Sequence, residues 1–135
     1  MENKNKIASF RDLEVYQKAY KLSILVMTKI IPKLPVSEKY DLKDQLSRSS
    51  KTIPRLIAEG YGKKHQKSGF QKYLDDAMSE TNETIVSLSH VQDIYKIEID
   101  LCEDLIKEYD ILGRQIYRLC EAWDNFSYKG RKPTT

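Results

Sequence analysis

The sequence predicts an all-α fold, an antiparallel up-down four-helix bundle whose second helix is kinked by a proline. Apolar residues recur at helical spacing in four segments, and short connections join these segments. The 135 residues suit one domain with one core, which we expect to span residues 10–126. Residues 1–9 and 127–135 are mostly polar or charged, and we expect both termini to be flexible.

The first helix is expected from about Phe10 to Ile31, and Ser9 and Asp12 have the spacing of a capping box at its start. One apolar stripe is assigned to the core: Leu13, Tyr16, Tyr20, Ile24, Met27 and Ile31. A second stripe lies well round the circumference, and a helix that is apolar nearly all round is buried on more than one side. We therefore expect this second stripe to form an oligomer interface: Val15, Leu22, Val26 and Ile30.

The second helix contains the segment from Leu42 to Gly62, with Ser37 as its expected N-cap. Pro54 lies inside the segment, where it removes a backbone donor and crowds the carbonyl of Ser50, so a kink is expected there. One face of the segment is apolar. The opposite face carries three basic residues about one helical turn apart, Arg48, Lys51 and Arg55.

The third helix is expected from about Gly69 to Tyr95, with Ser68 as its N-cap. Two small residues lie between bulky ones on its apolar face and allow a neighbouring helix to approach closely, Ala77 and Thr81. The apolar alternation that follows is too short for a strand, and we assign it to a connection. The fourth helix is expected from its cap, Asp100, to about Phe126.

Cys102 and Cys120 fall on the same face of the fourth helix, about 27 Å apart at the helical rise of 1.5 Å per residue. They cannot bond to each other within one chain, so we expect buried free thiols and a reducing compartment. The N-terminus lacks the apolar core of a signal peptide, and no apolar run is long enough to span a bilayer. We therefore expect a cytoplasmic protein with no membrane partner.

No pattern in the sequence points to catalysis, a cofactor or a metal. A di-metal site in a bundle needs Glu-x-x-His pairs, but Ser87 stands three residues before His90 and Gly62 three before His65. The segment after Gly60 lacks the preceding strand and the glycine spacing of a phosphate-binding loop. We expect a non-enzymatic protein with no catalytic residue, no metal site and no cofactor.

The charge of the chain is unevenly distributed, although its net charge is only +3. Eight Lys or Arg stand against two acids from Lys43 to Lys72, and eight acids stand against three bases from Glu98 to Asp124. Clustered cations on one face are typical of nucleic-acid binding, and no base-reading motif accompanies them, which favours backbone and shape recognition. The candidate residues are Arg48, Lys51, Arg55, Lys63, Lys64 and Lys67. Ordinary solvated helix faces remain the alternative interpretation.

Several motifs resemble the four-helix-bundle proteins encoded in intervening sequences of bacterial 23S rRNA genes. They are Phe10-x-Asp12-Leu13, Gln45-Leu46-x-Arg48-Ser49, Ile53-Pro54-x-x-Ile57-Ala58-Glu59-Gly60 and Phe70-x-x-Tyr73-Leu74-x-x-Ala77. The resemblance extends from about Phe10 to Phe126. It departs at Tyr16, where the family often has Trp, and at Leu56, where it often has Asn.

The same family includes the accessory variability determinant proteins of diversity-generating retroelements. This resemblance implies a homopentamer with a basic surface that binds nucleic acid and a reverse transcriptase. Our interpretation is a non-enzymatic, homopentameric nucleic-acid-binding accessory protein. Its expected partners are further copies of the same chain, RNA or DNA, and a reverse transcriptase. The alternative is a protein-interaction scaffold with no direct nucleic-acid role. The choice among RNA, DNA and a hybrid stays open, as does the choice between an rRNA and a retroelement context.

Overall fold

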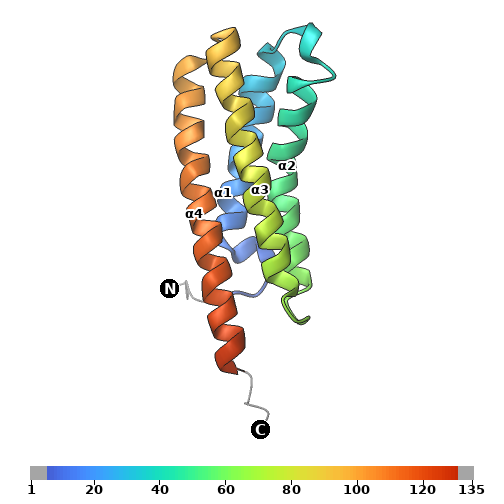
Figure 1. The fold of residues 1–135 in the computed structure, drawn as a ribbon, viewed down its shortest axis with the longest axis vertical. Helices are drawn as coiled ribbons and strands as arrows, with labels where there is room; N and C mark the ends of the chain where they lie inside the picture. Colours follow the sequence, from blue (N-terminus) through green and yellow to red (C-terminus); the bar gives the residue numbers. More distant parts are fainter. Residues whose placement is uncertain (1–5, 131–135) are drawn as a thin grey trace.

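Four long helices account for most of residues 6–130, the part of the chain that this computed structural model describes (Figure 1). Side chains are described as far as residue 124. The described residues include short 3-10 and π-helical turns but no strand. The all-α prediction is therefore confirmed for this part of the chain, with the helices α1 (Glu14–Leu25), α2 (Leu42–Gly62), α3 (Gly69–His90) and α4 (Ile99–Gly130).

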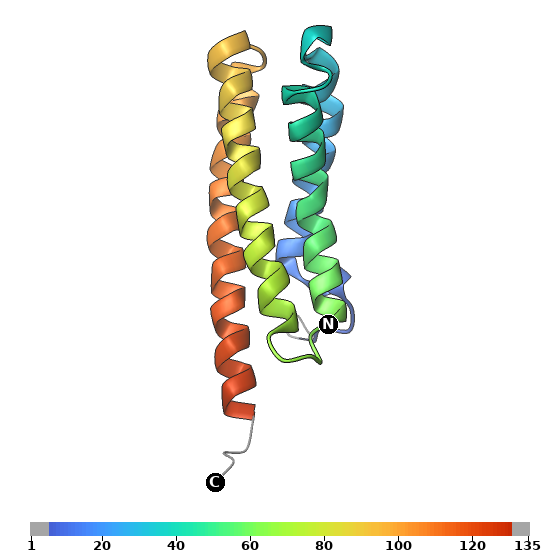
Figure 2. The same cartoon turned by 45° about the vertical axis from the view of Figure 1, so that its right-hand side comes forward.

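In Figure 2, α1 lies beside α2 and α3 lies beside α4. The most extensive packing is between α2 and α3, and α1 also packs against α4, so that the helices enclose one core between them. The predicted kink at Pro54 and the antiparallel order stay predictions; α2 is one helix from Leu42 to Gly62 with the proline inside it. The predicted flexibility of residues 1–5 and 131–135 lies outside the described residues, whereas α4 continues to Gly130.

The predicted capping box at Ser9 is confirmed, and it starts a 3-10 turn, Phe10–Asp12, that precedes α1. The Ser9 side chain accepts from the Arg11 N–H, and the Asp12 carboxylate accepts from the N–H groups of Ser9 and Ala8 at 2.9 and 2.8 Å. These backbone donors lower the pKa of Asp12.

The helix predicted from Phe10 to Ile31 is divided into several elements. After α1 the chain passes through a π-helical turn, Val26–Ile30, and a 3-10 turn, Ile31–Lys33.

The first helical segment buries its two apolar stripes differently from the prediction, although Leu13 and Ile31 lie in the core as predicted. The residues assigned to an oligomer interface, Val15, Leu22, Val26 and Ile30, are buried in the core of the chain itself. By contrast, Tyr20 and Ile24, which we assigned to the core, are 52% and 45% exposed. The physical reason is the rotation of α1 about its axis, which is set by packing against both α2 and α4. The interface prediction for the four aliphatic residues is therefore wrong.

Small residues allow α3 to pack closely against its neighbours. Ala77 and Thr81 are fully or almost fully buried, and Thr81 lies beside Gly113 of α4, where an added Cβ would be 3.7 Å from the Thr81 methyl group. The Thr84 hydroxyl donates to the Ser49 hydroxyl oxygen at 2.8 Å, which satisfies two buried polar groups between α3 and α2. At the other end of α2, a Cβ added to Gly60 would lie 2.6 Å from the Tyr73 Cβ. Only a glycine allows this approach without displacing α3.

Three predicted caps differ from the structure. Asp41 rather than Ser37 precedes α2, because residues 36–38 form a separate 3-10 turn. Ser68 precedes α3 in a left-handed conformation (φ 55°) and makes no side-chain cap. Asp100 lies within the first turn of α4, which begins one residue earlier. The turn into α3 depends on Gly69, since a Cβ there would be 2.1 Å from the Lys63 carbonyl oxygen.

Both cysteines are buried free thiols, which confirms the prediction for their side chains. Burial raises the pKa of Cys102 and of Cys120 to about 11, and nearby carboxylates add to the shift. Both groups are thus kept in the neutral thiol form at neutral pH. Among the described helices, none is long and apolar enough to cross a membrane.

Candidate nucleic-acid interface

All six cations that the sequence singled out have exposed side chains. Three of them lie on α2, Arg48, Lys51 and Arg55, and three in the connection between α2 and α3, Lys63, Lys64 and Lys67. The three cations on α2 are exposed because the opposite face of the helix carries the buried residues Leu46, Ile53 and Ile57. The structure nevertheless divides the six residues among three different environments.

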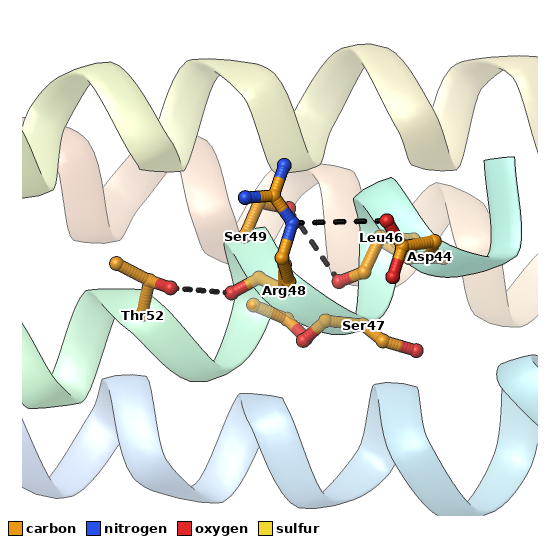
Figure 3. A network of polar contacts seen from close by, with 7 residues as sticks. Asp44, Leu46, Ser47, Arg48, Ser49 and Thr52 are labelled. Atoms are coloured by element: carbon orange, nitrogen blue, oxygen red, sulfur yellow. Dashed lines mark hydrogen bonds and ion pairs between the residues drawn. The ribbon is translucent and has the colours of Figure 1, made fainter. Parts of the chain in front are cut away.

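Arg48 lies on the α3 side of the stripe, among carboxylates. Its Nε is 3.8 Å from the Asp44 carboxylate one turn earlier on α2, and its backbone carbonyl accepts a hydrogen bond from Thr52 at 2.6 Å (Figure 3). Burial and the neighbouring Glu83 raise the pKa of Glu80 on α3, and the positive charge of Arg48 opposes this rise. Arg48 therefore has acidic neighbours that partly neutralise its field.

Lys51 and Arg55 lie on the α1 side of α2, where they line a surface pocket of about 380 Å³. The α1 wall of this pocket contains Tyr16, Tyr20 and Ile24, and the 3-10 turn before α1 contributes Phe10. Of the described residues that line the pocket, these two are cationic and none is acidic. The pocket thus combines an apolar wall with a positive rim.

The aromatic rings of the pocket form a continuous row. Phe10 and Tyr16 meet edge to face with their centroids 4.8 Å apart, and Tyr16 and Tyr20 stack at 6.0 Å with an angle of 28° between their planes. The guanidinium of Arg11 lies 4.6 Å from the Phe10 ring centroid, which adds a third cation at one end of the row. This row presents aromatic surface next to positive charge.

The three lysines of the connection have mixed surroundings. Lys63 and Lys67 line a separate pocket of about 760 Å³, which also includes the carboxylates of Asp75, Asp76 and Asp124. Lys64 turns toward Tyr61, with its Nζ 4.2 Å from the ring centroid. The net field of this group is weaker than its lysines alone predict, because three acids share the site.

Comparison with known proteins identifies the family of the chain. The family profile described as 23S rRNA-intervening sequence protein matches residues 11–118, from the turn before α1 to beyond the midpoint of α4. The chain belongs to the 23S rRNA-intervening sequence protein family. No curated protein and no solved structure gives a match to the chain. The family match agrees with the resemblance seen in the sequence motifs, whereas the retroelement subgroup stays a prediction.

In this 23S rRNA-intervening sequence protein, sequence reasoning located the exposed cations but missed the aromatic wall. We had assigned Tyr16, Tyr20 and Ile24 to the core because they share a helical stripe. One signal could have corrected the choice. The stripe that we had assigned to an interface is wholly aliphatic. Tyr16 and Tyr20, by contrast, carry hydroxyl groups that favour a partly exposed position. Within the described residues, no cluster of three or more His, Cys, Asp or Glu is placed to hold a metal ion.

Proposed function

We propose that this member of the 23S rRNA-intervening sequence protein family is a non-enzymatic, homopentameric accessory protein that binds nucleic acid. Its cations contact the sugar–phosphate backbone, and the residues involved are Arg48, Lys51, Arg55, Lys63, Lys64 and Lys67. The observation that carries the proposal is the position of Lys51 and Arg55, exposed beside each other on a pocket whose described lining has no acid. The family takes its name from 23S rRNA, which is consistent with a nucleic-acid partner.

The mechanism is electrostatic and multivalent. Each lysine or arginine that neutralises a phosphate releases condensed counterions, so affinity falls as the salt concentration rises. A single contact is weak, but a ring of five antiparallel bundles repeats the outer face of the proline-kinked α2 and raises the effective concentration of later contacts. The resemblance to the retroelement accessory proteins implies that the pentameric ring supports a reverse transcriptase, and the lack of a signal-peptide pattern in the sequence favours the cytoplasm. Sequence preference is slight on this basic surface, because phosphate contacts position a duplex without reading its bases.

Reversing Arg48, Lys51 and Arg55 together to Glu is expected to abolish binding. The change replaces attraction to phosphates by repulsion on the outer face of α2, and the exposed positions leave the fold intact. Fluorescence anisotropy with labelled RNA, DNA and hybrid duplexes at about 50 mM and 200 mM salt measures it. For the wild-type protein, the logarithm of the binding constant falls with the logarithm of salt by about 0.9 for each phosphate neutralised.

A matched control reverses three exposed lysines outside α2, Lys29, Lys96 and Lys107, to Glu. This control variant has the same change in net charge, and we expect it to retain most of the binding. Circular dichroism checks the helicity of both variants. The proposal is wrong if the wild-type protein shows no binding at the lower salt concentration, or if the α2 variant binds as well as the control.

The assembly is expected to give a mass of about five times 15.8 kDa by light scattering behind a sizing column. The number five comes from the family resemblance. A separate reason to expect assembly is the apolar surface outside the core, since Val86 on α3 and Tyr117 on α4 are each 53% exposed. A closed ring buries such surface equivalently in every copy. A stable monomer at micromolar concentration contradicts the proposed pentamer.

A protein-interaction scaffold is the second candidate function. It is favoured by the same exposed apolar residues of α3 and α4, which can contact a different protein instead of a further copy. The two functions differ in their dependence on charge. If the charge-reversed α2 variant retains full biological activity while a variant with Val86 and Tyr117 replaced by Ser loses it, the scaffold function replaces nucleic-acid binding.

A further inference from the structure

The pocket between α1 and α2 has features that binding to a phosphate backbone does not require. A backbone contact needs exposed cations, but this pocket also exposes aromatic and aliphatic surface, with Tyr20 at 52% and Ile24 at 45%. Large apolar side chains that remain together at the surface usually mark a binding site. Their position directly beside Lys51 and Arg55 joins the two kinds of surface in one site.

The pocket has the chemistry of a base-stacking site. Tyr16 and Tyr20 are stacked on each other, and the exposed face of Tyr20 offers a further stacking position. The Ser23 hydroxyl donates to the Tyr20 carbonyl oxygen at 2.6 Å, so it is satisfied within α1 and leaves the wall of the pocket apolar in character. A volume of about 380 Å³ is enough for one base with its sugar, within the range of small-ligand pockets.

The charge of the rim argues for a nucleic acid rather than a second copy of the chain as the occupant. Burial of the pocket against the exposed apolar residues of a second copy, such as Val86 and Ile94, would take Lys51 and Arg55 out of water without an anionic partner, and an unpaired buried cation is strongly unfavourable. A single-stranded nucleic acid avoids this cost because each base carries its own phosphate. One flat apolar base and one anion thus match the apolar wall and the positive rim together.

We propose that the pocket binds an unpaired base of single-stranded nucleic acid, with the base stacked on Tyr20 and the adjacent phosphates held by Lys51 and Arg55. This inference rests on the proposed nucleic-acid function and makes it more specific. In a duplex every base is paired and stacked on its neighbours, so a duplex reaches the cations but not the aromatic wall. The pocket therefore gives the protein a preference for single strands, while the remaining cations bind either form.

The test compares three probes of about twelve nucleotides: a single strand, the matching duplex, and a single strand in which the bases are replaced by abasic sites. Fluorescence anisotropy at low salt measures Kd for the wild-type protein and for Tyr20→Ala. We expect the wild type to bind the single strand more tightly than the abasic strand. Tyr20→Ala is expected to raise Kd for the single strand about tenfold, the size of effect that loss of one base–aromatic stack produces. Kd for the abasic strand and for the duplex is expected to stay unchanged.

Two further variants separate stacking from other effects. Tyr20→Phe keeps the ring and is expected to bind the single strand like the wild type. Tyr40→Ala is the matched control, because Tyr40 is 87% exposed and also lies beside a lysine, with the Lys39 Nζ 5.3 Å from its ring centroid, but is not among the residues lining the pocket. It is expected to leave all three affinities unchanged.

Each contrary result identifies what fails. If the wild type binds all three probes alike and Tyr20→Ala changes nothing, the pocket takes no base, although binding through the cations survives. If Tyr20→Ala instead changes the mass measured by light scattering, the pocket is a contact between copies and the inference is wrong. If the wild type binds none of the probes, the proposed function itself fails.

Discussion

Replacing Phe70 with alanine is expected to lower the free energy of unfolding by about 3–5 kcal/mol, the usual cost of truncating a buried phenylalanine. The ring of Phe70 is fully buried near the start of α3. It meets Tyr61 of α2 edge to face at 5.8 Å and Trp123 of α4 at 4.9 Å. Its removal therefore leaves a cavity among three helices and breaks two aromatic contacts at once.

Chemical denaturation followed by circular dichroism measures this change. The control is Val86→Ala on the same helix, which removes an exposed side chain and is expected to change stability by about 0.5 kcal/mol or less. Because Trp123 is the single tryptophan of the chain, its fluorescence should also change in Phe70→Ala. Equal effects of the two variants would mean that Phe70 does not join α2, α3 and α4 as described.

Gly60→Ala is expected to destabilise the protein by about 1–3 kcal/mol, although glycine to alanine inside a helix ordinarily stabilises by about 1 kcal/mol. The added methyl group would lie 2.6 Å from the Tyr73 Cβ and 3.1 Å from a ring carbon of Phe70. A Cβ atom cannot move without its backbone, so the clash is relieved only if α3 shifts away from α2. The loss of packing then exceeds the gain in helix propensity.

Gly62→Ala provides the matched control, since a Cβ at Gly62 meets nothing within 4 Å. Both glycines lie in the last turn of α2, and the same substitution at the two positions differs mainly in the contact with α3. We expect Gly62→Ala to be neutral or slightly stabilising by denaturant unfolding. A stabilising Gly60→Ala would refute the close contact between α2 and α3.

The pattern of helices could be predicted from the sequence because local interactions determine it. Apolar spacing located all four helices, and the prolines at 32 and 35 explain why the first helical segment ends where it does. The Ser9–Asp12 capping box was also correct, since it involves neighbouring residues alone. The caps at Ser37 and Ser68 were wrong, because the connections bend to suit the packing of the helices they join.

The cations of the site could likewise be predicted, because a lysine or arginine is exposed wherever α2 turns its polar face outward. The way in which the structure divides these cations among different surroundings could not be predicted from the sequence. Arg48 has acidic neighbours on α3 while Lys51 borders aromatic rings from α1, and this difference depends on which helices lie on either side of α2. Residues on different helices share a site only through tertiary packing.

The sequence by itself thus determined that α1 carries two apolar stripes, and tertiary structure alone decided which one enters the core. Both stripes have the same helical period, so periodicity could not distinguish them. Packing against α2 and α4 placed Val15 and Leu22 inside the bundle and left Tyr20 at the surface beside Lys51. The reason is geometric: rotating α1 about its axis leaves every local preference unchanged but exchanges the buried stripe for the exposed one.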